Sequence, residues 1–218
     1  MLLSLSQSET NAPYRADSPQ WVTHASPLVP ELPHLAFAPP ADSLVIGHIG
    51  SLYEGNPFRQ FLRACQSIAA QTNKRLRVVR VGSSPELDSV AAQYPAIFDS
   101  QGELDEEEAI PVLGSCHILY AMYPQGGRFA CFRRTSLPMK LSTYIQAQRP
   151  IFAHTPADSG LAQLITKHGV GIVCESNHEQ DIQAAVQNIM NAGITRENFE
   201  AIRADLMGRN SCTNCVRL

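Results

Sequence analysis

Residues 136–173, SLPMKLSTYIQAQRPIFAHTPADSGLAQLITKHGVGIV, give the clearest indication of the fold, because helix-like and strand-like segments alternate within them. Their pattern predicts a helix over 138–148, a strand over 150–154, a helix over 160–168 and a strand over 171–174. Pro138 suits the first turn of a helix, and Thr135 or Ser136 is the expected N-cap. Short apolar strands that alternate with helices indicate a parallel sheet covered on both faces.

The same alternation continues in both directions from this stretch. On the N-terminal side we expect strands at 44–49, 76–81, 96–98 and 117–120, with helices at 57–72, 86–93 and 105–113. On the C-terminal side we expect helices at 181–192 and 197–207. The sequence therefore predicts a doubly wound α/β fold with a Rossmann-like parallel sheet. Such folds bind ligands beyond the carboxyl ends of their strands, so function is sought just after Gly50, Gly82, Tyr120 and His154.

The composition fits one large domain with an extension. The chain has 218 residues, of which 44% are hydrophobic and only 17% are charged, and this excludes a disordered or fibrous chain. Seven of the 15 prolines fall within the first 40 residues, so residues 1–42 are expected to form an arm or interdomain linker. Residues 43–195 are expected to form the Rossmann-like domain, and 196–218 a C-terminal helix and polar tail.

The chain carries no signal for a membrane or for nucleic acid. No window holds about 18 unbroken apolar residues, and the start has no basic signal-peptide region. The net charge of −3 lacks the electrostatic footprint of a nucleic-acid binder. The six cysteines are scattered and mostly lie in apolar segments, which favours buried free thiols in a reducing compartment. A cytoplasmic protein without a transmembrane segment is therefore expected.

Two long windows, 55–85 and 109–157, contain no acidic residue. Within the second window RRTSLPMKL (133–141) places Arg133, Arg134 and Lys140 around an expected helix start. Free N–H groups at a helix N-terminus, together with a lysine, are suited to binding an anion. The alternative is that Thr135 or Ser136 only caps the helix and Lys140 is solvated. The glycines of GHIGSLYEGNP (47–57) permit close backbone approach but form no GxGxxG or Walker loop.

Other chemistries find little support in the sequence. There is no HExxH and no GxSxG, so neither a zinc hydrolase nor an α/β-hydrolase is indicated, and no metal or cofactor is expected. His48, His117 and His154 fall in strands or at their ends and are expected to be structural. Cys212 and Cys215 form a lone CxxC pair in a polar tail, so they are expected to be ordinary thiols.

Four stretches resemble, in order, the C-terminal donor-binding half of GT-B glycosyltransferases, above all retaining family 4 (glycosyl transferases group 1). They are IGHIGSLYEGNPFRQFLRACQSI (46–68), LRVVRVG (76–82), GELDEEEAIPVLGSCHILYAMYP (102–124) and residues 136–173. The resemblance covers about 44–190 and implies a site for a nucleotide diphosphate sugar. The implied contacts are Gly50 and Ser51 under the diphosphate, Leu104 at the base, charge from Arg133, Arg134 or Lys140, and phosphate and sugar contacts from Thr135, Ser136, Leu137, Pro138, Lys140 and Thr143.

The sequence also departs from that family. Members usually carry two glutamates eight positions apart, and here the matching residues are Thr135 and Thr143. The arginine that often follows the first glycine is Ser51. Only 42 residues precede the first strand, and the ending NSCTNCVRL (210–218) lacks the helical tail that crosses back to the other half. A half-enzyme is therefore expected, with an N-terminal glycosyltransferase half or another protein as partner.

Two other interpretations remain open from the sequence. The missing glutamates favour a degenerate, non-catalytic module used for interaction or structure. A flavodoxin-like or response-regulator domain is a third possibility, but no acidic cluster follows the first strand. Nucleotide binding separates the first interpretation from the second.

Overall fold

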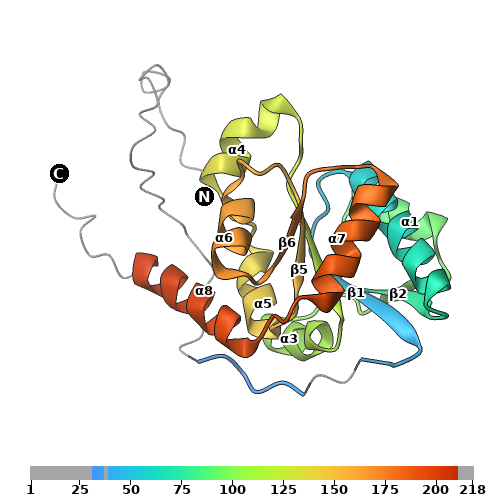
Figure 1. Cartoon of the computed structure of the whole chain (residues 1–218), viewed down its shortest axis with the longest axis horizontal. Helices are drawn as coiled ribbons and strands as arrows, with labels where there is room; N and C mark the ends of the chain where they lie inside the picture. Colours follow the sequence, from blue (N-terminus) through green and yellow to red (C-terminus); the bar gives the residue numbers. More distant parts are fainter. Residues whose placement is uncertain (1–30, 37–38, 211–218) are drawn as a thin grey trace.

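A computed structural model describes residues 31–36 and 39–210. Most of the expected N-terminal arm and the Cys212–Cys215 pair lie outside these residues. The described part is an α/β structure with helices on both sides of one sheet (Figure 1).

The sheet has six parallel strands in the order β3-β2-β1-β4-β5-β6. The strands are β1 (Ser43–Ile49), β2 (Arg75–Val81), β3 (Phe98–Ser100), β4 (Ile118–Met122), β5 (Ile151–His154) and β6 (Gly171–Cys174). The chain builds outward from β1 in one direction and then returns to add β4 on its other side. This order confirms the doubly wound, Rossmann-like fold, with the topological switch point between β1 and β4.

The described residues form eight α-helices and one 3-10 helix. They are α1 (Gly55–Gln71), α2 (Pro85–Gln93), α3 (Glu106–Gly114), η1 (Gly127–Phe129), α4 (Ala130–Thr135), α5 (Lys140–Ala147), α6 (Gly160–His168), α7 (Glu179–Asn191) and α8 (Arg196–Asn210). All the helices and strands expected from the sequence are present with shifted ends, but η1 and α4 were not anticipated.

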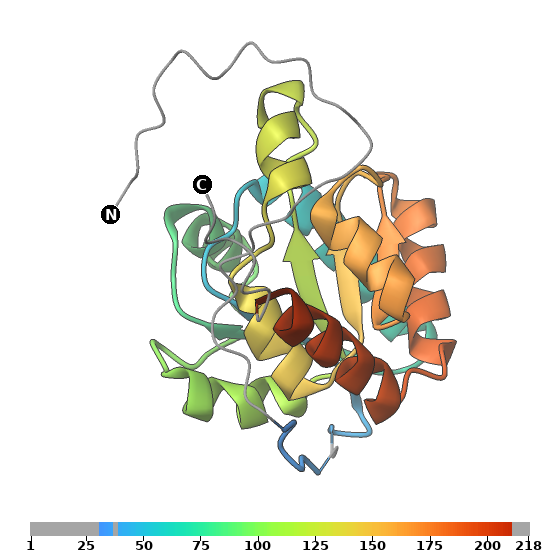
Figure 2. The same cartoon turned by 90° about the vertical axis from the view of Figure 1, so that its left-hand side faces the viewer.

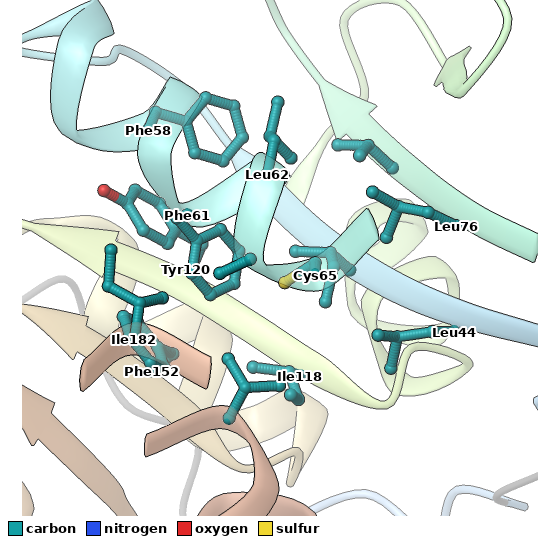
Figure 3. Close-up of a cluster of buried hydrophobic side chains, with 14 of the residues drawn as sticks. Leu44, Phe58, Phe61, Leu62, Cys65, Leu76, Ile118, Tyr120, Phe152 and Ile182 are labelled. Atoms are coloured by element: carbon teal, nitrogen blue, oxygen red, sulfur yellow. The ribbon is translucent and has the colours of Figure 1, made fainter. Parts of the chain in front are cut away.

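Each face of the sheet covers its own hydrophobic core. Successive strand residues point to opposite faces, so Ile118 and Tyr120 pack on one side and Leu119 and Ala121 on the other. On the first side Phe61 of α1 packs its ring 4.7 Å from that of Tyr120, among the residues drawn in Figure 3. Helices α3, α5, α6 and α8 contribute to the second core.

Helix α8 is packed onto the second core rather than standing apart. Phe199, Ile202 and Leu206 are buried in that core. At the start of α8 the Arg196 guanidinium donates to the carbonyl oxygens of Leu32, at 2.7 Å, and of Pro33, at 3.0 Å. A short stretch before β1 is thereby tied to the last described helix.

The expectations about membrane-spanning segments and about free cysteines can be compared with the described residues. None of their helices is both long and apolar enough to cross a membrane. Cys65, Cys116 and Cys174 are buried free thiols, whereas Cys131 is a free thiol on the surface of α4.

Candidate functional site

Three glycines shape the carboxyl edge of the sheet. Gly50 follows β1, Gly82 follows β2 and Gly102 follows β3, with φ angles of +71°, +78° and +73°. Only glycine adopts this left-handed region without strain. The Gly50 N–H donates to the Val81 carbonyl at 2.9 Å and the Gly82 N–H to the Gly102 carbonyl at 2.7 Å. The three turns therefore form one connected backbone surface beyond the strand ends.

Lys140, the first residue of α5, reaches this surface. Its Nζ donates to the Ser51 carbonyl oxygen at 2.8 Å and lies 3.4 Å from His48 Nε2. Within 31–36 and 39–210, no carboxylate forms an ion pair with the Lys140 ammonium. Burial lowers the pKa of Lys140 to about 7. The structure thus places the sequence candidate Lys140 directly beside the candidates Gly50 and Ser51.

The buried ring of His48 contacts the Lys140 ammonium, a role that the sequence analysis did not predict. The His48 ring is fully buried, and its Nδ1 lies 3.1 Å from the Tyr120 carbonyl oxygen, to which it donates. Burial, and then the Lys140 charge, lower the pKa of His48 to about 3. The ring is therefore neutral, and Nε2 is left to accept from the Lys140 ammonium. No sequence signal pairs these residues, because they lie 92 positions apart.

Arg133 and Arg134 differ from Lys140 because both are ion-paired with Asp158. Arg133 donates to the two Asp158 oxygens at 2.7 and 3.0 Å, and Arg134 Nε donates to Oδ2 at 2.7 Å. The hydrogen bond from Arg133, aided by Arg134, lowers the pKa of Asp158. Asp158 lies one residue beyond the acid-free window that singled out the arginines. It connects α4 to the loop before α6.

The expected N-cap of α5 is wrong. Thr135 ends α4 and donates its hydroxyl to the Cys131 carbonyl at 2.8 Å, while Ser136 donates to the Phe132 carbonyl at 2.6 Å. Hydroxyls four residues after a carbonyl readily bond back to it at a helix end. After Leu137 and Pro138, Met139 is the N-cap of α5 without a side-chain hydrogen bond. The first N–H groups of α5 therefore begin next to Lys140 without a side-chain cap.

A carboxylate from α3 faces Thr143. Glu106 Oε1 accepts from the Thr143 hydroxyl at 3.1 Å and from Gln146 Nε2 at 2.9 Å. The acidic run ELDEEE marks a helix start, but it does not show which glutamate turns toward α5. Leu104, expected at the base, is partly exposed in the loop between β3 and α3.

Aromatic side chains lie beside these groups at the same edge. The rings of Tyr53, Tyr123 and Phe132 contact one another at centroid distances of 5.3 to 5.9 Å. Tyr53 is 42% exposed and Phe132 40%, while Met139, adjacent to Lys140, is 77% exposed. Figure 2 shows the yellow-green α4 at the top, beyond the point of the β4 arrow. The edge thus combines a cation, a helix N-terminus and an apolar surface.

No protein-family model and no curated protein matches the sequence, but solved structures share the fold. AviGT4, a glycosyltransferase involved in avilamycin A biosynthesis, is 18% identical with a TM-score of 0.50, covering 78% of this chain and 48% of its own. WaaG, a glycosyltransferase involved in lipopolysaccharide biosynthesis, is 14% identical with a TM-score of 0.52, covering 76% and 43%. The lipopolysaccharide outer core galactosyltransferase WaaB is 11% identical with a TM-score of 0.56, covering 82% and 52%.

The chain spans about half the length of these solved glycosyltransferases. Its six-stranded parallel sheet matches one half of the GT-B architecture that they share. The expected fold and the expected structural similarity to GT-B glycosyltransferases are therefore confirmed.

Proposed function

We propose that this chain is the donor-binding half of a glycosyltransferase and that its carboxyl edge binds a nucleotide diphosphate sugar. Three solved glycosyltransferases with the same half-chain fold support this proposal. The position of the site at the topological switch point supports it further, because α/β sheets bind ligands there.

The observation that carries the proposal is the environment of Lys140. Its ammonium lies against the Ser51 carbonyl, close to the Gly50 turn and the uncapped start of α5. Among the described residues no carboxylate pairs with Lys140, and a diphosphate would supply that negative charge. The N–H groups at the start of α5 favour the same anion. In this proposal the positive charge that binds the diphosphate therefore comes from Lys140, whereas Arg133 and Arg134 are paired with Asp158.

The chemistry of such a site is electrostatic. Sugar transfer from a nucleotide donor develops negative charge on the leaving diphosphate, and preorganised donors stabilise it. Lys140 and the first turn of α5 supply those donors in this proposal. Glu106, already fixed against Thr143, supplies a carboxylate that can accept from a sugar hydroxyl. Acceptor binding is assigned to a second half, because the solved relatives are about twice as long.

Calorimetric titration of the chain tests the proposal. UDP, GDP, ADP and dTDP are titrated free and sugar-linked, and saturable binding of one base is expected. Lys140→Met should weaken that binding at least tenfold, about 1.4 kcal/mol. Arg134→Gln is the matched control and should change the affinity less, because its charge is already paired with Asp158. Unchanged affinity in Lys140→Met contradicts the assignment.

A second candidate function is a degenerate module without donor binding. The observation that favours it is that several expected ligand contacts are used internally: Arg133 and Arg134 on Asp158, Thr135 on Cys131 and Thr143 on Glu106. Failure of all four nucleotides and their sugar conjugates to bind the folded chain selects this candidate.

A further inference from the structure

Three aromatic side chains at the carboxyl edge have no part in the proposed diphosphate contacts. Tyr53, Tyr123 and Phe132 are called the aromatic platform below. Tyr53 lies in the loop between β1 and α1, Tyr123 directly follows β4, and Phe132 lies on α4. Tyr53 and Phe132 are exposed, whereas Tyr123 is fully buried. The platform therefore offers exposed aromatic surface that rests on a buried ring.

The Tyr53 ring is held from two sides. Its centroid lies 5.9 Å from that of Tyr123 and 5.9 Å from that of Phe132. Tyr123 is fixed in turn, because its hydroxyl lies 3.0 Å from the Ser136 hydroxyl and its ring meets that of Phe132 edge-on. A ring arranged in advance loses little conformational freedom when a ligand binds. Tyr53 is thus preorganised for a contact on its exposed side.

The aromatic platform adjoins the Lys140 site. Ser51, whose carbonyl oxygen accepts from the Lys140 ammonium at 2.8 Å, precedes Tyr53 by two residues. Two residues of chain span at most about 7 Å. In a nucleotide diphosphate sugar the sugar is bonded directly to the terminal phosphate. A diphosphate bound by Lys140 would therefore bring its sugar within reach of the Tyr53 ring.

The other side of the same edge carries a carboxylate. A Cβ atom added to Gly82 would lie 3.4 and 3.6 Å from the two carboxylate oxygens of Glu103, so Glu103 lies over the turn that follows β2. In doubly wound folds a carboxylate placed there accepts from ribose hydroxyls, and it repels phosphate. The strand order puts Gly82 and Tyr123 on opposite sides of β1. The nucleoside therefore suits the Glu103 side, and the sugar suits the platform.

The surface of a pyranose ring complements the aromatic platform. Such a sugar has C–H groups on its two faces and hydroxyls around its rim. The face of an aromatic ring carries partial negative charge, so it attracts the weakly positive C–H groups. The hydroxyl of Tyr53 gives the same side chain a polar end that can meet the sugar rim.

We propose that the Tyr53 ring stacks on the pyranose of the nucleotide sugar, while Tyr123 and Phe132 hold Tyr53 in place. This assignment rests on the proposed donor function, with the diphosphate on Lys140. It makes Tyr53 a residue that recognises the sugar and not the nucleotide. Loss of the ring therefore weakens binding of the sugar-linked nucleotide and spares that of the free nucleotide.

Calorimetry tests this difference with four pairs of ligands: UDP and UDP-glucose, GDP and GDP-mannose, ADP and ADP-glucose, and dTDP and dTDP-glucose. For the base that binds, Tyr53→Ala should weaken the sugar conjugate about fivefold and change the free nucleotide less than about twofold. Tyr53→Phe keeps the ring and should retain the wild-type affinity for the conjugate. Tyr94→Ala removes a tyrosine at the C-terminal end of α2 and, as the matched control, should change neither affinity.

A second variant and a second measurement keep the test valid if Tyr53→Ala does not fold. Tyr53→Leu preserves apolar volume without an aromatic face, so it should also weaken the conjugate selectively. In saturation-transfer NMR, irradiation of the aromatic protons of the wild-type chain should transfer saturation to the C–H protons of the bound sugar. The transfer should be much smaller in Tyr53→Leu.

The outcomes separate the sugar assignment from the proposed donor function. If no nucleotide binds the folded chain in either form, the donor function is wrong and the sugar assignment falls with it. If a nucleotide binds, but the Tyr53 variants weaken its free and sugar-linked forms equally, the ring contacts the nucleoside and only the sugar assignment is overturned. Unchanged affinity of these variants for the conjugate overturns it as well.

Discussion

At the scale of single residues, Lys140 carries the strongest functional signal. Its ammonium donates to one carbonyl oxygen and lies against the neutral ring of His48. A cation in such surroundings favours its neutral form, and the pKa of Lys140 falls to about 7. Arg133 shows the contrast, since Asp158 compensates its charge. An anionic ligand would pair with the charge of Lys140 as Asp158 pairs with that of Arg133.

This environment predicts a pH dependence of donor binding. In the proposed donor site the protonated form of Lys140 binds the diphosphate, so affinity for the nucleotide sugar should fall as pH rises through about 7. The fall approaches tenfold per pH unit, and binding is accompanied by proton uptake. Calorimetry between about pH 6 and pH 9, in buffers of different ionisation enthalpy, measures both effects. Lys140→Arg keeps its charge and should flatten the profile; an unchanged slope in that variant would assign the proton to another group.

The linkage also sets the sign of the stability change in the free chain. Because the folded-state pKa of Lys140 is depressed below its ordinary value of 10.5, the unfolded chain binds more protons between about pH 7 and pH 10. The contribution of Lys140 to the free energy of unfolding should therefore rise with pH across that window. Chemical denaturation of the wild type and of Lys140→Met at both ends of the window gives this difference.

At the scale of elements, the break between α4 and α5 shapes the site. A single helix start was expected near Ser136, but α4 ends there and α5 begins at Lys140. The short α4 is held by Asp158 and by the contact of its Phe132 ring with Tyr123. Because α4 stands beyond the tip of β4 (Figure 2), this attachment positions the exposed apolar surface beside Lys140.

Removing the charge of Asp158 should loosen α4 selectively. In Asp158→Asn, Arg133 and Arg134 lose their carboxylate partner, and the cost should be about 1 kcal/mol because the group is partly exposed. Hydrogen exchange should accelerate over residues 130–135 while the amides of β4 and β5 stay protected. Asp205→Asn, which removes the partner of Lys167 and His168 on another helix, is the control and should leave exchange at 130–135 unchanged. Equal acceleration in both variants would contradict the inference that Asp158 holds α4 in place through Arg133 and Arg134.

At the scale of the whole molecule, one sheet joins two cores. Phe61 belongs to the core under α1, and Phe199 of α8 belongs to the core on the other face. Strand residues contribute alternately to both, as Ile118 and Leu119 show. Loss of packing on either face therefore weakens the same strands.

Both cores should unfold in one transition. Phe61→Ala and Phe199→Ala each remove a fully buried ring and should lower the free energy of unfolding by about 3–5 kcal/mol. Denaturant titrations followed by far-UV and by near-UV circular dichroism should remain single transitions with the same midpoint. A separate early transition in Phe199→Ala would make α8 an independent unit.

The fold, and the type and order of nearly all described helices and strands, could be predicted from the sequence. Apolar periodicity and turn residues act over a few positions, so the stretch 136–173 already indicates its strands at 150–154 and 171–174, close to the observed bounds. The glycines after β1 and β2 could likewise be located, and they adopt positive φ angles there, which glycine does without strain. The N-cap at Thr135 or Ser136 failed because either hydroxyl can also bond back to a preceding helix.

Which of the candidate site residues lie in contact, and with which partners, could not be predicted without the three-dimensional structure. Lys140 lies on His48, Thr143 on Glu106, and Arg133 on Asp158, and the partners are between 25 and 92 positions apart. A cavity where the strands begin likewise joins His117, Arg149 and Arg196, which no motif connects. Periodicity specifies which face of an element is buried, but not which side chain of another element lies opposite. The side chain that lies opposite depends on how the parallel sheet brings distant segments together. The same arrangement determines whether a charged side chain is paired within the protein or remains available to a ligand.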